Sequence, residues 1–456
     1  MDPRLAADLA DLPDLLTAAR DYAAGVLDGL DDRPAAVPPP AFDPVPLPAA
    51  GLGAAQALEV FRERWAPGFS GSAGPRYLGF VTGGATPAAL LGDWLTGTFD
   101  QNASARVGSS AVDLERETVG WLRSLFHLKD DFDGTFVTGA TMSNTVGLAI
   151  GREWLGERKG VSVARQGVTA LGDITVLSGA PHSSVYKALS ILGIGRDQLR
   201  IVPVQPDREA VDVAELDRCL SETVGPAIVV ANAGTVNTVD FDDLRAIAAL
   251  KGRHDFWLHV DAAFGGFAAL TAEHRHLVDG LDLADSICID LHKWLNVPYD
   301  AAVQFTRRQD LQVSVFQNAA AYLTAPGPDP DPFHLTPENS RRLRALSAWF
   351  ALAAYGADGH REIVARNVAL ARRFGAEVAT LPGVRLLSPV RLNVVCFGVE
   401  GDVEAILKAV AASGEAFLTP TVHGGGPALR AAFSNWRTRD GDVDRVLAVL
   451  REVLAE

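Results

Sequence analysis

Short apolar runs alternate with helix-like segments through the middle of this chain. The runs occupy residues 174–177, 227–231, 257–261, 286–290 and 301–305. Such alternation is typical of a mostly parallel sheet that is covered by helices on both faces. We therefore predict an α/β fold. In open sheets of this kind ligands bind at the carboxyl ends of the strands, so we look for functional residues there.

The flanking regions predict two further parts. Residues 1–60 contain a helix-like pattern over 5–30 and then a proline-rich extended arm, while residues 61–310 form the predicted large domain. We expect the arm to bury its apolar stripe on a second subunit; packing on its own body is the alternative.

Residues 311–456 are predicted to form a loop, a linking helix and a smaller C-terminal α+β domain. Thr336 and Pro337 have the pattern of an N-cap and first helical residue, and predict a long helix that ends near Gly356. Beyond it we expect strands at 384–387, 392–397 and 429–434 and helices at 402–412 and 442–454.

Composition excludes several classes of protein. The net charge of −15 over 456 residues argues against a nucleic-acid surface, which needs clustered positive charge. Three scattered cysteines offer neither a disulfide framework nor metal-ligand spacing, so we expect no metal site. The first residues lack a signal pattern and no apolar stretch is long enough to cross a bilayer, so we expect a cytoplasmic protein.

One strand-like run delivers a lysine to a turn. Ser286-Ile-Cys-Ile is followed by Asp290, His292 and Lys293. A lysine attacks an aldehyde as the neutral amine, and an apolar setting favours that form, so Lys293 is a candidate Schiff-base lysine. Taken alone, the motif favours a solvated lysine after a strand, because most lysines are solvated.

Three other segments end in residues that suit pyridoxal phosphate (PLP). Asp261 ends the run 257–261, where a buried carboxylate needs a cationic partner such as a pyridinium N–H. Gly139, Ala140 and Thr141 begin a helical pattern, where backbone N–H groups bind phosphate. His182 follows the run 174–177, and its imidazole is able to stack on a pyridine ring. Each segment alone also has an ordinary structural explanation.

Together these segments resemble the PLP-dependent amino-acid decarboxylases, the family of the aromatic amino-acid and glutamate decarboxylases. The resemblance covers most of the chain. It rests on Asp-Leu-His-Lys-Trp-Leu from Asp290, His-Val-Asp-Ala-Ala from His259 and Pro-His-Ser-Ser-Val-Tyr-Lys-Ala from Pro181. It implies the fold type I, aminotransferase-like architecture, a homodimer, and decarboxylation of an amino acid.

The resemblance also implies roles for individual residues. Lys293 would carry the cofactor, Asp261 would pair with its ring nitrogen, and His182 and Ala263 would lie on opposite faces of the ring. The remaining cofactor contacts would come from Gly139, Ala140, Thr141, Asp290 and His292 around the phosphate and from Thr235 near the ring.

The loop between Tyr322 and Arg341 departs from the family. Relatives carry there a mobile tyrosine that donates a proton in the neighbouring subunit, and this loop contains no tyrosine. His182 or His334 would then be the proton donor, although a solvated His334 is an alternative. A second alternative is a decarboxylating aldehyde synthase, in which O2 reacts instead and Phe333 lies in the loop. Carbon–carbon lyases and a non-catalytic protein of this fold fit the motifs less well.

The substrate side chain is not specified by the sequence. By the resemblance, Phe80 and Asn102 are substrate-contacting candidates. The segment 101–106, Gln-Asn-Ala-Ser-Ala-Arg, is polar where aromatic decarboxylases carry apolar pocket residues. Arg106 would suit an acidic side chain, but a surface or structural arginine is the simpler interpretation.

Overall fold

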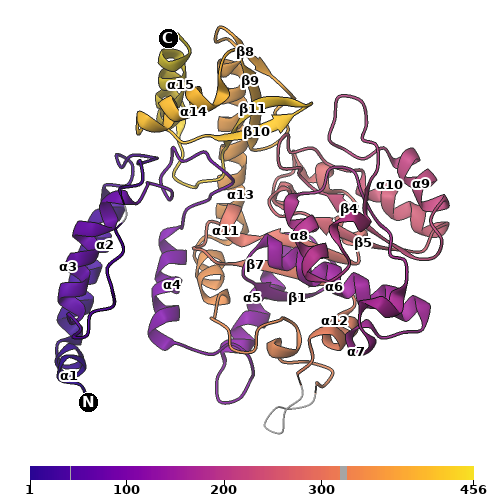
Figure 1. Cartoon of the computed structure of the whole chain (residues 1–456), viewed down its shortest axis with the longest axis horizontal. Coiled ribbons are helices and arrows are strands. Elements are labelled where there is room, and N and C mark those ends of the chain that lie inside the picture. Colours follow the sequence, from indigo (N-terminus) through magenta and orange to yellow (C-terminus); the bar gives the residue numbers. More distant parts are fainter. Residues whose placement is uncertain (42, 319–325, 456) are drawn as a thin grey trace.

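The computed structural model describes residues 1–41, 43–318 and 326–455 (Figure 1). Its larger sheet has seven strands in the order β1-β7-β6-β5-β4-β2-β3. Their bounds are β1 Asp133–Val137, β2 Val176–Ser178, β3 Leu199–Ile201, β4 Ala227–Asn232, β5 Phe256–Asp261, β6 Ser286–Asp290 and β7 Ala302–Thr306.

This sheet is mostly parallel, as the alternation of apolar runs predicts. Strands β2 to β6 pair in parallel, whereas β7 is antiparallel to both β1 and β6. Asn232 pairs with Asp261, and Asp261 pairs with Cys288 near the end of β6. The carboxyl ends of β4, β5 and β6 therefore lie side by side, and each presents a polar side chain there.

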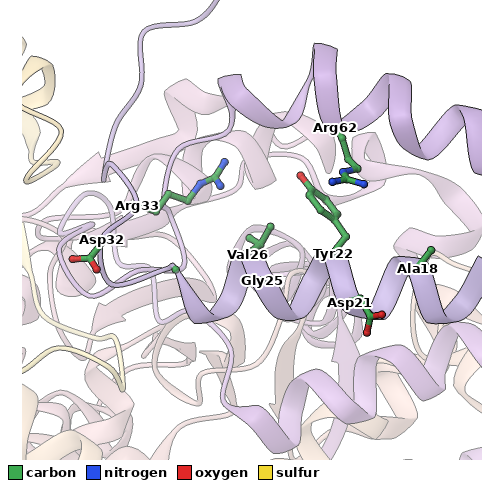
Figure 2. Close-up of a pocket in the computed structure, with 9 residues that line it drawn as sticks. Ala18, Asp21, Tyr22, Gly25, Val26, Asp32, Arg33 and Arg62 are labelled. Carbon is green, nitrogen blue, oxygen red and sulfur yellow. The ribbon is translucent and has the colours of Figure 1, made fainter.

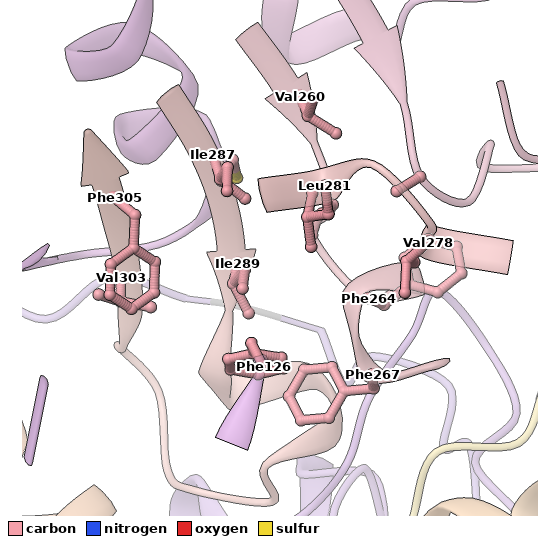
Figure 3. Packing of buried hydrophobic residues seen from close by; sticks show 14 of the residues in the cluster. Phe126, Val260, Phe264, Phe267, Val278, Leu281, Ile287, Ile289, Val303 and Phe305 are labelled. Atoms are coloured by element: carbon pink, nitrogen blue, oxygen red, sulfur yellow. The ribbon is translucent and has the colours of Figure 1, made fainter. Parts of the chain in front are cut away.

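Helices cover this sheet and bury its apolar side chains. Helix α6 (Ala140–Lys159) packs against β5, β6 and β7 and against α8 (Ser183–Ile191). Figure 3 shows the core beside β5 to β7, where Phe126, Phe267 and Phe305 pack near Ile287 and Ile289. The other large-domain helices are α4 Pro87–Phe99, α5 Ala111–Leu125, α7 Val163–Gln166, α9 Val213–Ser221, α10 Leu244–Ala249, α11 Leu291–Trp294 and α12 Gln309–Phe316.

A smaller antiparallel sheet, ordered β10-β11-β9-β8, forms the C-terminal part. It packs with α14 and α15 around a separate apolar cluster that includes Phe374, Phe397 and Phe433. The predicted α+β character of this region is confirmed. The bounds are β8 Val384–Leu386, β9 Val394–Val399, α14 Val403–Ala412, β10 Thr419–His423, β11 Gly426–Ala432 and α15 Asp440–Ala455.

The predicted start of the linking helix is wrong. Helix α13 spans Ala345–Val378 rather than beginning at Pro337. Arg341, before it, is held by a buried ion pair with Glu115 at 2.9 Å and by the carbonyl oxygen of Phe136 at 2.8 Å. These tertiary contacts override the local N-cap signal. At Gly356 the backbone has φ 57° and ψ −170°, which is non-helical, so a first helix ends there as predicted and a second continues α13 beyond the kink.

The N-terminal arm lies beside the body in Figure 1. Its helices expose apolar side chains. The predicted helix is divided into α1 (Pro3–Ala10) and α2 (Leu12–Asp28), followed by α3 (Ala54–Arg64). Leu5, Leu9, Leu12 and Leu16 are each at least 45% exposed. The arm therefore does not bury this stripe on its own body. Across the described residues, no helix has the length and apolar character needed to cross a membrane.

Candidate active site

A cavity of about 210 Å³ lies at the carboxyl ends of β4, β5 and β6. Seven of the residues predicted from the sequence line it. The lining comprises Phe80, Val81, Ala140, His182, Asn232, Gly234, Thr235, Val236, Asp261, Ala263, Phe264, Lys293 and Arg430. A parallel sheet brings these distant segments together because its strand ends share one edge.

Lys293 lies in the short helix α11, between β6 and β7. Its Nζ is 3.5 Å from Oδ2 of Asp290 and 5.6 Å from the ring centre of Phe264. A Cβ atom added at Gly83 would lie 1.8 Å from the carbonyl oxygen of Lys293. Only glycine therefore fits at position 83, where the backbone packs against the turn that carries Lys293.

Asp261 and His182 lie near each other in the same cavity. Asp261 Oδ2 accepts a hydrogen bond from Nδ2 of Asn144 at 2.8 Å, and its Oδ1 accepts one from the backbone N–H of Ala263 at 3.2 Å. His182 caps α8, where its Nδ1 accepts from the N–H of Ser184 at 3.2 Å. Burial lowers the pKa of His182, so the imidazole is neutral and carries its proton on Nε2.

The predicted phosphate residues gather at the N-terminus of α6. Gly139 is the N-cap, and the N–H of Ala140 donates to Oδ2 of Asp290 at 3.2 Å. Thr141 follows in the first helical turn. His292 Nδ1 accepts from the N–H of Ala301 at 3.3 Å and lies 3.1 Å from Oδ1 of Asp290. Burial lowers the pKa of His292, so its ring is neutral, and Oδ1 of Asp290 is buried without a hydrogen-bond partner.

Thr235 lines the cavity and is held by a polar network. Its hydroxyl donates to Oε2 of Glu209 at 2.5 Å and accepts from the N–H of Asp240 at 2.9 Å. Glu209 also accepts from the Thr238 hydroxyl at 2.7 Å. These contacts fix the side chain of Thr235 beside the cavity.

The structure does not place Asn102 or His334 in this cavity. Asn102 is exposed, and its Oδ1 accepts from the N–H of Arg341 at 3.0 Å. His334 is 2% exposed, and its Nδ1 accepts from the N–H of Asn318 at 3.1 Å, so the solvated alternative is wrong. Tyr322 lies outside the described residues. Arg106 is ion-paired with Asp113 and Asp329, which agrees with a structural role.

Sequence analysis missed Arg430, which enters the cavity from β11 of the small domain. The residue is 6% exposed, and its Nε and Nη2 have no hydrogen-bond partner. Burial lowers the pKa of this guanidinium. The available signal was a charged residue within the otherwise apolar run 429–433. A buried, unpaired guanidinium is the chemistry expected for binding an anion.

The side chains of the cavity fit PLP. A primary amine, a carboxylate and an imidazole face one volume, and the first turn of α6 opens beside them. A Cβ atom added at Gly139 would lie 3.1 Å from Cε1 of His292, so the backbone at the N-terminus of α6 packs closely against this ring. Lys293 would bind the aldehyde, Asp261 the ring nitrogen, and the N-terminus of α6 the phosphate.

Comparisons with known proteins agree with this chemistry. A family model described as the pyridoxal-dependent decarboxylase conserved domain matches residues 43–400. An aromatic-L-amino-acid decarboxylase of Bacillus atrophaeus is 28% identical over 333 residues, covering 71% of this chain and 67% of the relative.

Two solved structures share the fold over 98% of both chains. The Oryza sativa TDC with PLP and tryptamine has a TM-score of 0.89 at 22% identity. The Rhodiola rosea 4-hydroxyphenylacetaldehyde synthase has a TM-score of 0.86 at 21% identity. The chain therefore has a fold type I architecture.

The fold and the family match define a PLP-dependent enzyme. The chain belongs to the pyridoxal-dependent decarboxylase family, and it is a PLP-dependent amino-acid decarboxylase. Its substrate is an amino acid.

Proposed function

We propose that Arg430 binds the carboxylate that the enzyme removes, in the cavity shared by Lys293, Asp261 and His182. The observation that supports this proposal is the unpaired, buried guanidinium beside the candidate Schiff-base lysine. An arginine fork matches the two oxygens of a carboxylate. Placing that group near Lys293 orients the bond to be broken with respect to the cofactor.

Each cavity residue has a distinct proposed role. When bound, PLP supplies the electron sink for the bond that breaks at the α-carbon. Lys293 holds the cofactor and yields to the substrate amine, and Asp261 keeps a proton at the ring nitrogen. His182 covers one ring face and Ala263 the other. We assign to Nε2 of His182 the relay of a solvent proton to the α-carbon after CO2 leaves, so the ring is neutral before and after the transfer.

The phosphate contacts remain proposals for Gly139, Ala140, Thr141 and His292. Asp290 orients this region, since it accepts from Ala140 and lies beside Lys293. Phe80 is a proposed substrate contact, because it lines the cavity while remaining 61% exposed. A role for Asn102 or His334 would require the cavity of a second copy of the chain.

The aldehyde-synthase alternative rests on the missing tyrosine between Tyr322 and Arg341. The experiment incubates the holoenzyme with each amino acid and measures CO2, amine and hydrogen peroxide together. We expect CO2 and amine in equal amounts. Oxygen consumption in step with CO2 release would replace the amine-forming proposal with the oxidative one.

Attachment of the cofactor is tested separately. Borohydride should fix PLP to the peptide that contains Lys293, and Lys293→Ala should lose the absorption of the attached cofactor. Lys187, which follows His182 in α8, is the matched control because it does not line the cavity. Label on Lys187 instead would refute the assignment.

We also propose that the protein is a homodimer. One face of α4 exposes Leu91, Trp94, Leu95 and Phe99, which follow helical spacing. The N-terminal arm adds its exposed leucines, and an apolar area of this kind is typical of an interface, to which we commit a second copy as the occupant. A groove of about 820 Å³ between α2 and α3 is lined by charged as well as apolar side chains (Figure 2).

The dimer is tested by charge on the exposed face of α4. A Leu91→Arg/Phe99→Arg double variant should sediment as a monomer with little activity, whereas Val224→Arg, at a loop position that is 98% exposed, should not. Mixing a Lys293→Ala chain with a chain that lacks residues 326–334 should restore activity if sites are shared. An active monomer would overturn the proposal.

Two further expectations remain proposals. We place the domain boundaries near residues 60 and 310. We also propose a cytoplasmic location, which the three buried free thiols support.

A further inference from the structure

A chain of buried hydrogen bonds runs behind the cavity. The Trp257 Nε1–H donates to Oγ of Ser286 at 3.0 Å, and this oxygen lies 2.7 Å from Nδ1 of His259. Nε2 of His259 lies 2.9 Å from Oδ1 of Asn144. All four side chains are at most 1% exposed, so water does not compete for these contacts.

The series of hydrogen bonds branches at Asn144. Its Nδ2 donates to Oδ2 of Asp261 at 2.8 Å and to Oγ of Ser184 at 3.0 Å. Oγ of Ser184 in turn lies 2.8 Å from Nδ1 of His182. The buried amide of Asn144 therefore contacts Asp261 directly and reaches His182 through the hydroxyl of Ser184.

The donor and acceptor of every hydrogen bond in this series are determined by its two terminal groups, the Trp257 indole and the Asp261 carboxylate. An indole N–H only donates and a carboxylate only accepts. Ser286 must therefore donate to His259, and His259 must donate from Nε2 to Oδ1 of Asn144. A flipped Asn144 amide would place its oxygen against the carboxylate of Asp261. Burial lowers the pKa of His259 to about 4, so its ring is neutral in this arrangement.

The same logic determines the branch to His182. Oγ of Ser184 accepts from Asn144, so its hydrogen is free to donate to Nδ1 of His182. The backbone N–H of Ser184 donates to the same nitrogen. The proton of His182 therefore stays on Nε2, the atom to which we assign proton transfer.

We infer that Asn144 is a positioning residue for decarboxylation, which sets the orientation of the Asp261 carboxylate and of the His182 imidazole together. This inference rests on the proposed roles of Asp261 and His182. Both amide hydrogens and the amide oxygen of Asn144 are used, so no other side chain of similar shape satisfies all three partners. Asn144 does not line the cavity.

The first test removes the amide and keeps its volume. Asn144→Leu should retain PLP and its fold, while kcat falls ~10 to 100-fold, as for other residues that orient a functional group. KM should change little. Asn393 is the matched control, because it is equally buried and its side-chain nitrogen and oxygen have no partner. Asn393→Leu should leave kcat unchanged.

The second test replaces the amide donor of Asn144 by an acceptor. Asn144→Asp places an acceptor against Asp261 and a negative charge beside His259. The variant must take up one extra proton, on His259 or between the two carboxylates, and lose it as the pH rises. The charged and titratable groups around this position are Asp261, His182, His259, Cys288, Asp290, Lys293 and Arg430.

Two readouts follow that proton. In ¹⁵N-histidine NMR of the apoprotein, wild-type His259 and His182 should carry protons on Nε2 only. In Asn144→Asp, either His259 should titrate at a higher pH, or the cofactor absorption should gain a pH step absent from wild type and from Asn393→Asp. If neither change occurs, or if Asn144→Leu behaves like Asn393→Leu, the inference is wrong.

These outcomes separate the inference from the proposed function. If Asp261→Ala and His182→Ala turn over at the wild-type rate, the proposed roles themselves fail. If both variants are inactive while Asn144→Leu is normal, only the positioning role fails.

Discussion

Replacing Arg430 by methionine should lower activity without lowering stability. Methionine keeps the length of the side chain but removes the guanidinium. In the free protein, Nε and Nη2 of Arg430 are buried without partners. Replacing such a group by an apolar side chain is often neutral or stabilising, so the urea midpoint of the apoprotein should not fall.

The loss of activity follows from the bonds that a carboxylate would make. Two charge-assisted hydrogen bonds contribute about 1.5–3 kcal/mol each, or about 3–6 kcal/mol together. Converted to rates, this is roughly a 10²- to 10⁴-fold loss in kcat/KM. Arg430→Lys keeps the charge without the fork, so its loss should be intermediate.

The assay measures kcat/KM from CO2 release and the urea midpoint of the same preparations. Arg76→Met is the control, since Arg76 is 3% exposed but donates to the carbonyl oxygens of Asp31 and Glu415. That variant should lose stability and keep kcat/KM. An Arg430→Met enzyme within ~3-fold of wild type in kcat/KM, far below the loss expected from two such bonds, would refute the carboxylate role.

Three more changes have defined outcomes. Asp261→Ala should keep some cofactor and lose nearly all CO2 release, and wild-type turnover would make Asp261 structural. Gly83→Ala should lose cofactor absorption because its Cβ meets the Lys293 carbonyl, whereas Gly97→Ala on α4, with nothing within 4 Å, should not. Burial lowers the pKa of His259 and of His360 from 6.5 to about 4, so the unfolded chain binds more protons between these values. Stability present above pH 6.5 should fall by about 3 kcal/mol per histidine as pH decreases to 4, measured by urea unfolding, and His360→Leu should flatten that dependence.

The sequence predicts the sheet and most of the cavity because both depend on local patterns. Apolar runs indicated the parallel strands, and the residues at the strand ends, Asp261 and Lys293 among them, line one cavity. The signal for Arg430 is weaker, a single charge in an apolar run, because this residue reaches the cavity only through the packing of the small domain on the large one. Asn144 was likewise visible only as part of a helix, since its three partners lie far away in the sequence, two on β5 and one on α8.

Where local signals failed, tertiary contacts explain the failure. Thr336 and Pro337 have the pattern of a helix start, yet α13 begins at Ala345. The guanidinium of Arg344 reaches Asp300 at 3.0 Å and Glu338 at 2.9 Å, which holds the intervening segment in a non-helical path. His334 was expected in a solvated or catalytic loop, and burial against its own chain separates it from the cavity in the same subunit.

Because β7 runs antiparallel to β6, the turn that carries Lys293 is closed by residues near in the sequence. The N–H groups of Leu291 and His292 both donate to the carbonyl oxygen of Ala301. Pairing of this local kind forms readily, whereas bringing His182 and Arg430 to the lysine requires the closure of long loops. We expect the reactive amine to be assembled first during folding. Before His182 and Arg430 reach the Lys293 amine, no neighbouring side chain distinguishes one aldehyde from another. Selectivity for the cofactor therefore requires the completed fold.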